Sequence, residues 1–211
     1  MKTVRRALLP LLAACGGACV GIAPSPAGVL LEARLEGIDL RLEFALPGEP
    51  AKPYVLATLQ GRSFVLDPET GIVRDRLEGG EAPPRRVEPA ADRLDGVRLS
   101  APGGGAMVAG QLGFYHLLFH EGRICGELLV SPWMAEPLRP AVRALTLLER
   151  IEPRLRPRER HGCPPLPLAS WAQKGWPLLV SGREVTIFRT ERIRFDHPLP
   201  PLLAGEAIPS R

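Results

Sequence analysis

A period of two in residues 37–48, GIDLRLEFALPG, is the feature that most constrains the fold. Apolar residues alternate there with charged ones at Ile38, Leu40, Leu42, Phe44 and Leu46. Successive side chains of a strand point to opposite faces of its sheet, so the pattern predicts a strand with one face on a core and the other in water. The preceding residues, GVLLEARLEG, alternate in the same way. Residues 36–37 therefore predict a tight connection between two such strands.

Further strand-like segments continue along the chain at residues 53–75, 112–132 and 175–200. The 24 prolines and 22 glycines are too many for a mostly helical protein and favour many turns. Pro68 and Gly71 in DPETG predict one such turn. Residues 78–92 and 101–106 are polar or glycine-rich interruptions between strands. The segment 112–132 has apolar residues at both odd and even positions, which predicts a strand that is buried on both faces.

The period changes after Pro140, where apolar residues recur at helical spacing: Ala141, Ala144, Leu145, Leu148 and Ile151. Proline suits a first helical turn, and Pro153 prevents continuation, so a helix from Pro140 to about Glu152 is expected. A short second helix is expected to end at Gly175. The fold class is therefore α+β, an antiparallel sheet with one main and one short helix.

The N-terminus reads as an export signal, with Lys2, Arg5 and Arg6 followed by an apolar run. Residues 12–15, LAAC, resemble the lipobox of bacterial lipoproteins. This resemblance implies that residues 1–14 are a signal peptide, that Cys15 carries lipid, and that residues 15–27 are a tether before a single domain at 28–208. Gly16 in place of an aspartate favours the outer membrane. The alternatives are cleavage after Ala27, which gives a soluble periplasmic or secreted protein, and an uncleaved anchor.

The charge balance argues against a nucleic-acid partner. Removing residues 1–14 takes away three bases and no acid, which leaves 24 bases against 23 acids. Nucleic-acid binding needs a clustered basic face, and aromatic residues for base stacking make up only 5% of the chain.

Two cysteines of the mature chain, Cys125 and Cys163, are expected to pair, because exported thiols favour disulfides. No nucleophile, metalloprotease or nucleotide-binding motif is present, and no catalytic residue, metal or cofactor is expected. His116 and His120 share one face of a strand, but residues four apart on a strand lie about 13 Å apart. That separation is too great for one metal ion.

The order of segments resembles the lipoprotein-carrier superfamily of the LolA and LolB type. The resemblance is carried by VLLEARLEG and IDLRLEFAL, by FVLDPETGIV, by the change from CGELLVSP to AVRALTLLERI, and by the late GWPLLV and VTIFRTERI strands. It implies a strongly curved antiparallel half-barrel whose concave face is covered by helices and encloses an apolar cavity for acyl chains. The helical cover is thin here, and the proline-rich segments are additional.

The expected function is non-catalytic binding of a lipid or other amphipathic ligand in the cell envelope, on the periplasmic side. The candidate cavity residues are Leu42, Phe44, Phe114, Leu118 and Leu128. Burial of acyl chains against such residues is worth about 0.8 kcal/mol per CH₂. The partners are then the membrane, through the N-terminal lipid, and the ligand. The alternatives are a structural or protein-interaction module with a filled core and an envelope protein as partner, and an envelope enzyme whose site is assembled from distant residues.

Overall fold

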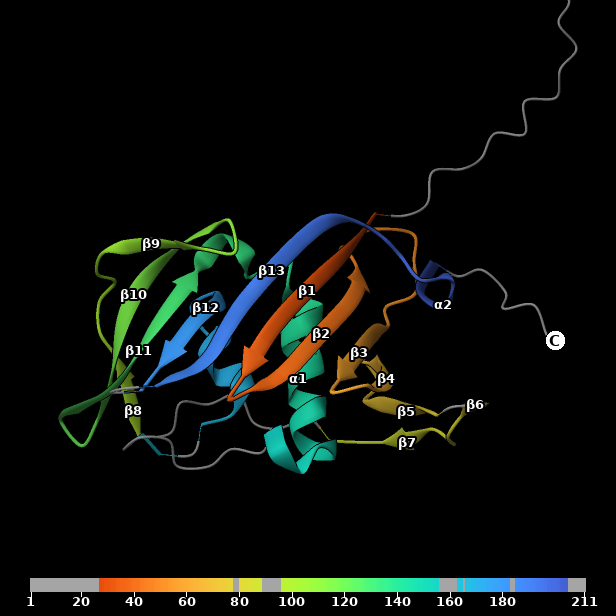
Figure 1. Cartoon of the computed structure of the whole chain (residues 1–211), viewed down its shortest axis with the longest axis horizontal. Helices are drawn as coiled ribbons and strands as arrows, with labels where there is room; N and C mark the ends of the chain where they lie inside the picture. Colours follow the sequence, from red (N-terminus) through yellow and green to blue (C-terminus); the bar gives the residue numbers. More distant parts are fainter. Residues whose placement is uncertain are drawn as a thin grey trace, which may run out of the picture.

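One antiparallel sheet curves around a single long helix as an open half-barrel (Figure 1). The computed structural model describes residues 27–77, 80–88, 96–155, 163–164, 166–182 and 185–204. The helix is α1 (Arg139–Ile151). The strands are β1 (Ala27–Leu35), β2 (Ile38–Ala45), β3 (Val55–Leu59), β4 (Arg62–Asp67), β5 (Ile72–Leu77), β6 (Gly80–Glu81), β7 (Arg85–Arg86), β8 (Val97–Leu99), β9 (Gly105–Val108), β10 (Gln111–His120), β11 (Arg123–Ser131), β12 (Trp176–Ser181) and β13 (Thr186–Pro198).

The order of the strands brings the two ends of the domain together at the middle of the sheet. It runs β6-β5-β4-β3-β2-β1-β13-β12-β11-β10-β8, with β7 beside β5 and β9 beside β10. The first strand therefore pairs with the last, Ala27 lying opposite Pro198 and Leu35 opposite Phe188. β11 and β12 also pair across a long separation, because α1 lies between them in the chain, and Glu127 is opposite Ser181. The remaining pairs on this path join strands that lie closer together in the chain. The fold class expected from the sequence, including its curvature, is confirmed.

Each strand of the sheet runs between two rims. We define the upper rim as the side where β2, β11 and β13 end (Figure 1). By antiparallel pairing, β4 ends and β10 begins on that same side, so loop 46–54, turn 68–71 and hairpin 109–110 belong to it. At the lower rim, β1, β3 and β10 end in turns 36–37, 60–61 and 121–122. Helix α1 begins at the upper rim and ends at the lower one.

The predicted alternation is reproduced in the burial of β1 and β2. Val29, Leu31, Ala33 and Leu35 of β1 and Ile38, Leu40, Leu42 and Phe44 of β2 all belong to the main core. Asp39 and Arg41 lie on the other face and are exposed. Glu43 is the exception, because it is buried on that outer face, where Oε2 lies 2.9 Å from Nε2 of His197.

The tight turn predicted at residues 36–37 is present. Glu36 has a φ of +46° and Gly37 of +84°. Two consecutive positive φ angles define the turn that matches the twist of a hairpin, and glycine adopts the second without strain. Residues 60–61, 109–110 and 121–122 show the same pair of positive angles.

Helix α1 forms where the sequence predicts it, within one residue at each end. Pro140 lies in its first turn, and Glu152 ends it with an extended backbone. The apolar stripe packs into the main core with Ala141, Ala144, Leu145 and Leu148. The helix contacts β2, β3 and β4 and the segment after it.

The second helix differs from the prediction. The segment that was expected to form it is a 3₁₀ helix, η3 (Leu168–Ala172), followed by Gly175 at a φ of +136°. The short α-helix is instead α2 (Pro201–Ala204). It lies on the outer face, where Leu199 and Leu203 pack on Leu56 and Val65 in a small second core. The sequence did not reveal it, because four residues are too few to show a helical period.

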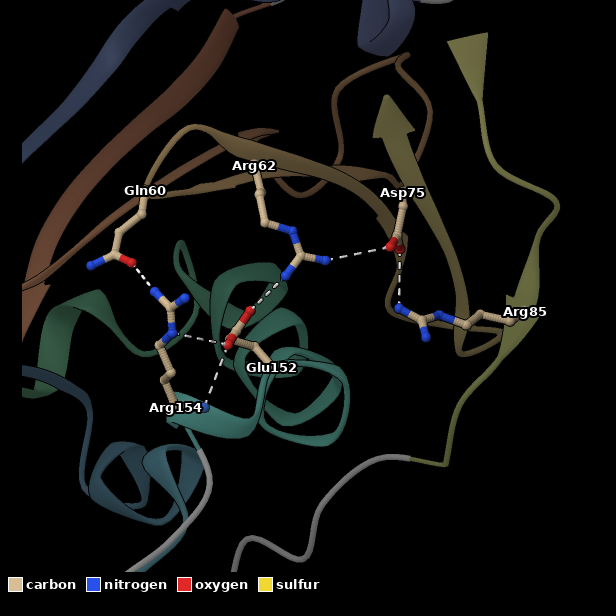
Figure 2. A network of polar contacts seen from close by, with 6 residues as sticks. All are labelled: Gln60, Arg62, Asp75, Arg85, Glu152 and Arg154. Carbon is tan, nitrogen blue, oxygen red and sulfur yellow. Dashed lines mark hydrogen bonds and ion pairs between the residues drawn. The ribbon is translucent and has the colours of Figure 1, made fainter. Parts of the chain in front are cut away.

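An ion-pair network holds the end of α1 against the sheet at the lower rim (Figure 2). Arg62 contacts Oε2 of Glu152 through Nη1 at 3.0 Å and Oδ2 of Asp75 through Nη2 at 3.7 Å. Arg85 of β7 contacts Asp75 at 3.1 Å, and Arg154 bonds Gln60. Charged groups thus bridge the outer strands and the helix.

Candidate functional site

The interior of the half-barrel is a packed core at the positions that the sequence predicted for a ligand cavity. Leu42 and Leu128 are 0% exposed, Phe44 is 1% exposed and Leu118 is 2% exposed. All four belong to one continuous apolar cluster with α1 and η3. Phe114, the fifth candidate, is half-buried and lies near the start of β10, at the upper rim. The structure therefore separates Phe114 from the other four.

The predicted disulfide between Cys125 and Cys163 is confirmed, with the Cα atoms 5.0 Å apart. It ties β11 to the segment that follows α1, and both residues are buried. Cys15, like residues 1–26 as a whole, lies outside the described residues. The signal peptide and the lipid anchor therefore stay predictions. No helix among the described residues is long and apolar enough to cross a membrane.

Four apolar side chains meet at the upper rim: Met107, Leu112, Phe114 and Trp133. We call them the apolar cluster. Met107 lies directly opposite Leu112 in the β9–β10 hairpin, so their side chains share one face. Phe114 follows on the same face, and its ring centroid lies 5.6 Å from that of Trp133. Met107, Leu112 and Trp133 are 63%, 42% and 57% exposed, among the largest apolar exposures of the described residues.

Trp133 is positioned by the segment that links β11 to α1. It lies in a 3₁₀ helix, η1 (Pro132–Met134), which begins directly after β11. The amide of Leu138 then donates to the carbonyl of Met134, so the chain stays coiled up to the first turn of α1. At a rise of about 1.5 to 2 Å per residue, Trp133 lies roughly 10 Å from Arg139.

A pocket of about 270 Å³ opens beside the start of α1, and we call it the rim pocket. Loop 46–54, turn 68–69 and the first turns of α1 form its walls. The apolar lining comes from Ala45, Leu46, Pro47, Ala51, Pro53, Tyr54, Pro68 and Pro140. The charged lining comes from Lys52, Arg139, Arg143, Glu49 and Glu69. The rim pocket thus combines apolar walls with three cations and two acids.

The loop wall of the rim pocket is fixed by the two cores. Leu46 packs against the main core, and Ala51 and Tyr54 pack against the small outer core. The amide of Lys52 donates to the carbonyl of Leu203 at 3.2 Å, which ties the loop to α2. The pocket therefore lies where the inner and outer cores meet.

The described histidines each serve the fold. Nδ1 of His116 lies 2.9 Å from the carbonyl oxygen of Ser100, and Nδ1 of His120 lies 3.0 Å from that of Gly96. His197 pairs with the buried Glu43. Within the described ranges, no three His, Cys, Asp or Glu side chains gather as they would around a metal ion. His116 and His120, the two histidines that prompted the metal hypothesis, thus contact backbone carbonyl groups.

Sequence reasoning found Phe114 but missed the rest of this site. Trp133 lies in SPWM, between a strand and a helix. In such a connection no strand or helix periodicity assigns a large aromatic residue to the core. Such an isolated tryptophan in a connection is a usable signal of an exposed aromatic group. Arg139 and Arg143 are four residues apart on α1, but Lys52 lies 87 residues before Arg139, and no spacing rule joins it to the two arginines.

The fold and the rim define a class: an open, helix-covered half-barrel with an apolar and charged upper rim. Comparisons of the chain with models of protein families, with curated proteins and with solved structures gave no match. The resemblance to the lipoprotein carriers therefore stays a prediction.

Proposed function

We propose that this protein is a non-catalytic envelope protein that binds a lipid or another amphipathic molecule at the upper rim of the half-barrel. The apolar cluster is the observation that carries the proposal. Exposed apolar side chains that lie together mark contact surfaces, whereas single ones are ordinary. Here four of them come from β9, β10 and η1, and they lie near a pocket with charged walls.

The filled interior favours a ligand site at the rim over one inside the half-barrel. Opening a cavity among Leu42, Phe44, Leu118 and Leu128 would remove large side chains from a close-packed core. Each such side chain contributes roughly 1.5 to 3 kcal/mol through its burial. The rim offers apolar surface without that cost. The proposal therefore keeps the class of ligand expected from the sequence and moves its site from the interior to the rim.

The proposed anchor is compatible with a ligand taken from or delivered to a membrane. If Cys15 carries lipid, eleven residues separate it from Ala27, the start of β1 at the upper rim. An extended chain of that length reaches at most about 40 Å. The upper rim would then stay within about 40 Å of the bilayer that holds the lipid.

A titration tests the proposal, and Trp133 supplies its signal. Of the three tryptophans, Trp171 and Trp176 are 2% and 0% exposed, so a ligand at the rim changes mainly the emission of Trp133. Residues 21–211, which contain every described element, would be exported to a periplasm and titrated with a short-chain amphiphile below its critical micelle concentration. Native mass spectrometry of the same sample would show bound mass in the lipid range.

Matched variants make the test specific to the rim. Trp133→Ser is expected to weaken amphiphile binding about tenfold in the mass-spectrometric titration, because the apolar contact between the indole ring and the bound ligand is lost. Ile124→Ser is the control, since Ile124 is 47% exposed and lies at the lower rim. Equal loss in both variants, or an unliganded mass at every ligand concentration, would contradict the proposal.

A structural or protein-interaction module is the second candidate, and the filled core favours it. A protein partner would use the same apolar cluster as its contact surface. The two candidate functions differ in what copurifies with the protein from the envelope: a lipid or another protein. Stoichiometric copurification of one envelope protein, lost in Trp133→Ser, together with an unliganded native mass, would favour this candidate.

A further inference from the structure

We propose that the rim pocket binds the phosphodiester head group of the amphiphile, while the apolar part of that ligand lies on the apolar cluster. This inference rests on the proposed function and names the chemical class of its ligand. It is carried by the charges of the pocket, by its size and by its distance from Trp133.

Two of the three pocket cations are available to a ligand. Lys52 and Arg143 make no ion pair among the described residues, and both are exposed. Arg139 shares its guanidinium with Glu136. An arginine can give a phosphate group two parallel hydrogen bonds, and a lysine adds a compact charge. The three side chains approach from the helix wall and the loop wall of one pocket.

The start of α1 adds to the positive potential. Its N-cap residue, Leu138, makes no side-chain hydrogen bond to the helix, and the first turn contains no acidic residue. The amide of Arg139 donates to the carbonyl of Glu136, and Pro140 has no amide hydrogen, so the helix contributes through its dipole rather than through open donors. The N-terminal end of that dipole is positive and favours anions.

The acidic residues of the pocket limit the negative charge of the ligand that it can bind. Glu49 and Glu69 lie on the loop and turn walls, away from the helix. They oppose a second negative charge. A phosphodiester carries one negative charge, whereas a phosphate monoester carries about −1.5 to −2 at neutral pH. The pocket therefore favours the diester of a phospholipid head group over free phosphate.

The volume of the pocket agrees with a head group rather than a whole lipid. About 270 Å³ lies just below the roughly 300 to 1,000 Å³ of pockets that hold drug-sized ligands. A whole phospholipid does not fit in that space, so part of the ligand lies outside it. The apolar cluster begins at Trp133, roughly 10 Å away along the coiled segment from Arg139.

The test compares two short-chain amphiphiles of equal chain length on residues 21–211: dihexanoyl phosphatidylglycerol and hexyl maltoside. Arg143→Gln removes one pocket cation, and Arg150→Gln is the control, since Arg150 is exposed on the same helix but lies in its last turn. Binding is measured by Trp133 emission, and circular dichroism confirms that each variant is folded. We expect Arg143→Gln to bind the phospholipid about tenfold more weakly, the loss of one charge-assisted hydrogen bond, with the maltoside unchanged.

The outcomes separate this inference from the proposed function. Equal affinity of Arg143→Gln and the unaltered chain for the phospholipid, or the same loss in Arg150→Gln, would overturn the head-group site while maltoside binding still supports the rim. Inorganic phosphate that competes at the affinity of the phospholipid would reassign the pocket to free phosphate and overturn the inference. If the unaltered chain binds neither amphiphile, the proposed function itself fails.

Discussion

Arg62, the first residue of β4, donates a hydrogen bond of 3.0 Å to Glu152, the residue that ends α1 (Figure 2). The two residues are 90 positions apart. Their side chains differ in environment, because that of Arg62 is 58% exposed and that of Glu152 is 7% exposed. The pair fixes the lower end of the helix and, through it, the position of the rim pocket at the upper end.

Replacing Arg62 should cost more than replacing an arginine of equal exposure elsewhere. Arg62→Met leaves the buried carboxylate of Glu152 with Arg154 alone, at 3.7 Å, and we expect it to lower the free energy of unfolding by about 2 kcal/mol. Urea denaturation followed by circular dichroism gives that value.

Arg34→Met is the matched control. Arg34 is also 58% exposed, but its partner Asp39 is 72% exposed. Asp39 raises the pKa of Arg34, first by its hydrogen bond and then by its charge. Since arginine stays protonated in either case and water screens the pair, no measurable loss of stability is expected. Equal losses in the two variants would show that the burial of Glu152 is irrelevant.

The disulfide should be a major source of stability. Cys125 and Cys163 are 38 positions apart, and a cross-link of that span stabilises by about 4 kcal/mol in the chain-entropy model. The double variant Cys125→Ser, Cys163→Ser is expected to lose that amount in a urea titration. Reduction of the unaltered chain should give the same midpoint as the double variant. A reduced midpoint that matches the oxidised one would contradict the expectation.

Replacing Leu128 distinguishes a packed core from a ligand cavity in the interior. It is 0% exposed between β10 and β12, so Leu128→Ala should destabilise the protein by about 3 kcal/mol, the usual cost of a large-to-small core change. Amphiphile affinity at the rim should stay within twofold. A stable Leu128→Ala variant that has lost its ligand would instead place the ligand in the interior.

Most of the fold followed from local patterns in the sequence. The alternation in β1 and β2 predicted the strands and their buried faces, and the helical period after Pro140 predicted α1. The apolar parity of residues 112–132 predicted burial on both faces, which the structure bears out for Leu128, Leu129 and Val130. These features depend on neighbours along the chain and need no knowledge of the topology.

The features that were missed depend on contacts between distant segments. Glu43 reads as a solvent-facing residue of β2, yet it is buried because β13 returns beside β1 and brings His197 to it, 154 positions away. The rim pocket arises in the same way, from a loop, a turn and a helix start. The cavity hypothesis for Leu42, Phe44, Leu118 and Leu128 depended on the thickness of the helical cover, and η3 adds to α1 in filling the interior.

Two glycines give the last prediction, on how closely the strands pack. A Cβ on Gly126 of β11 would lie 2.5 Å from the carbonyl oxygen of Ser181 on β12, closer than real Cβ atoms come to backbone. Gly126→Ala must therefore push β11 and β12 apart, and we expect a loss of about 2 kcal/mol, within the usual range for overpacking. A Cβ on Gly104 meets nothing within 4 Å. Gly104→Ala should leave stability unchanged or raise it by about 0.5 kcal/mol, because it restricts the unfolded chain. Thermal unfolding of both variants checks the pair, and a Gly126→Ala protein as stable as the unaltered chain would refute the close approach of β11 and β12.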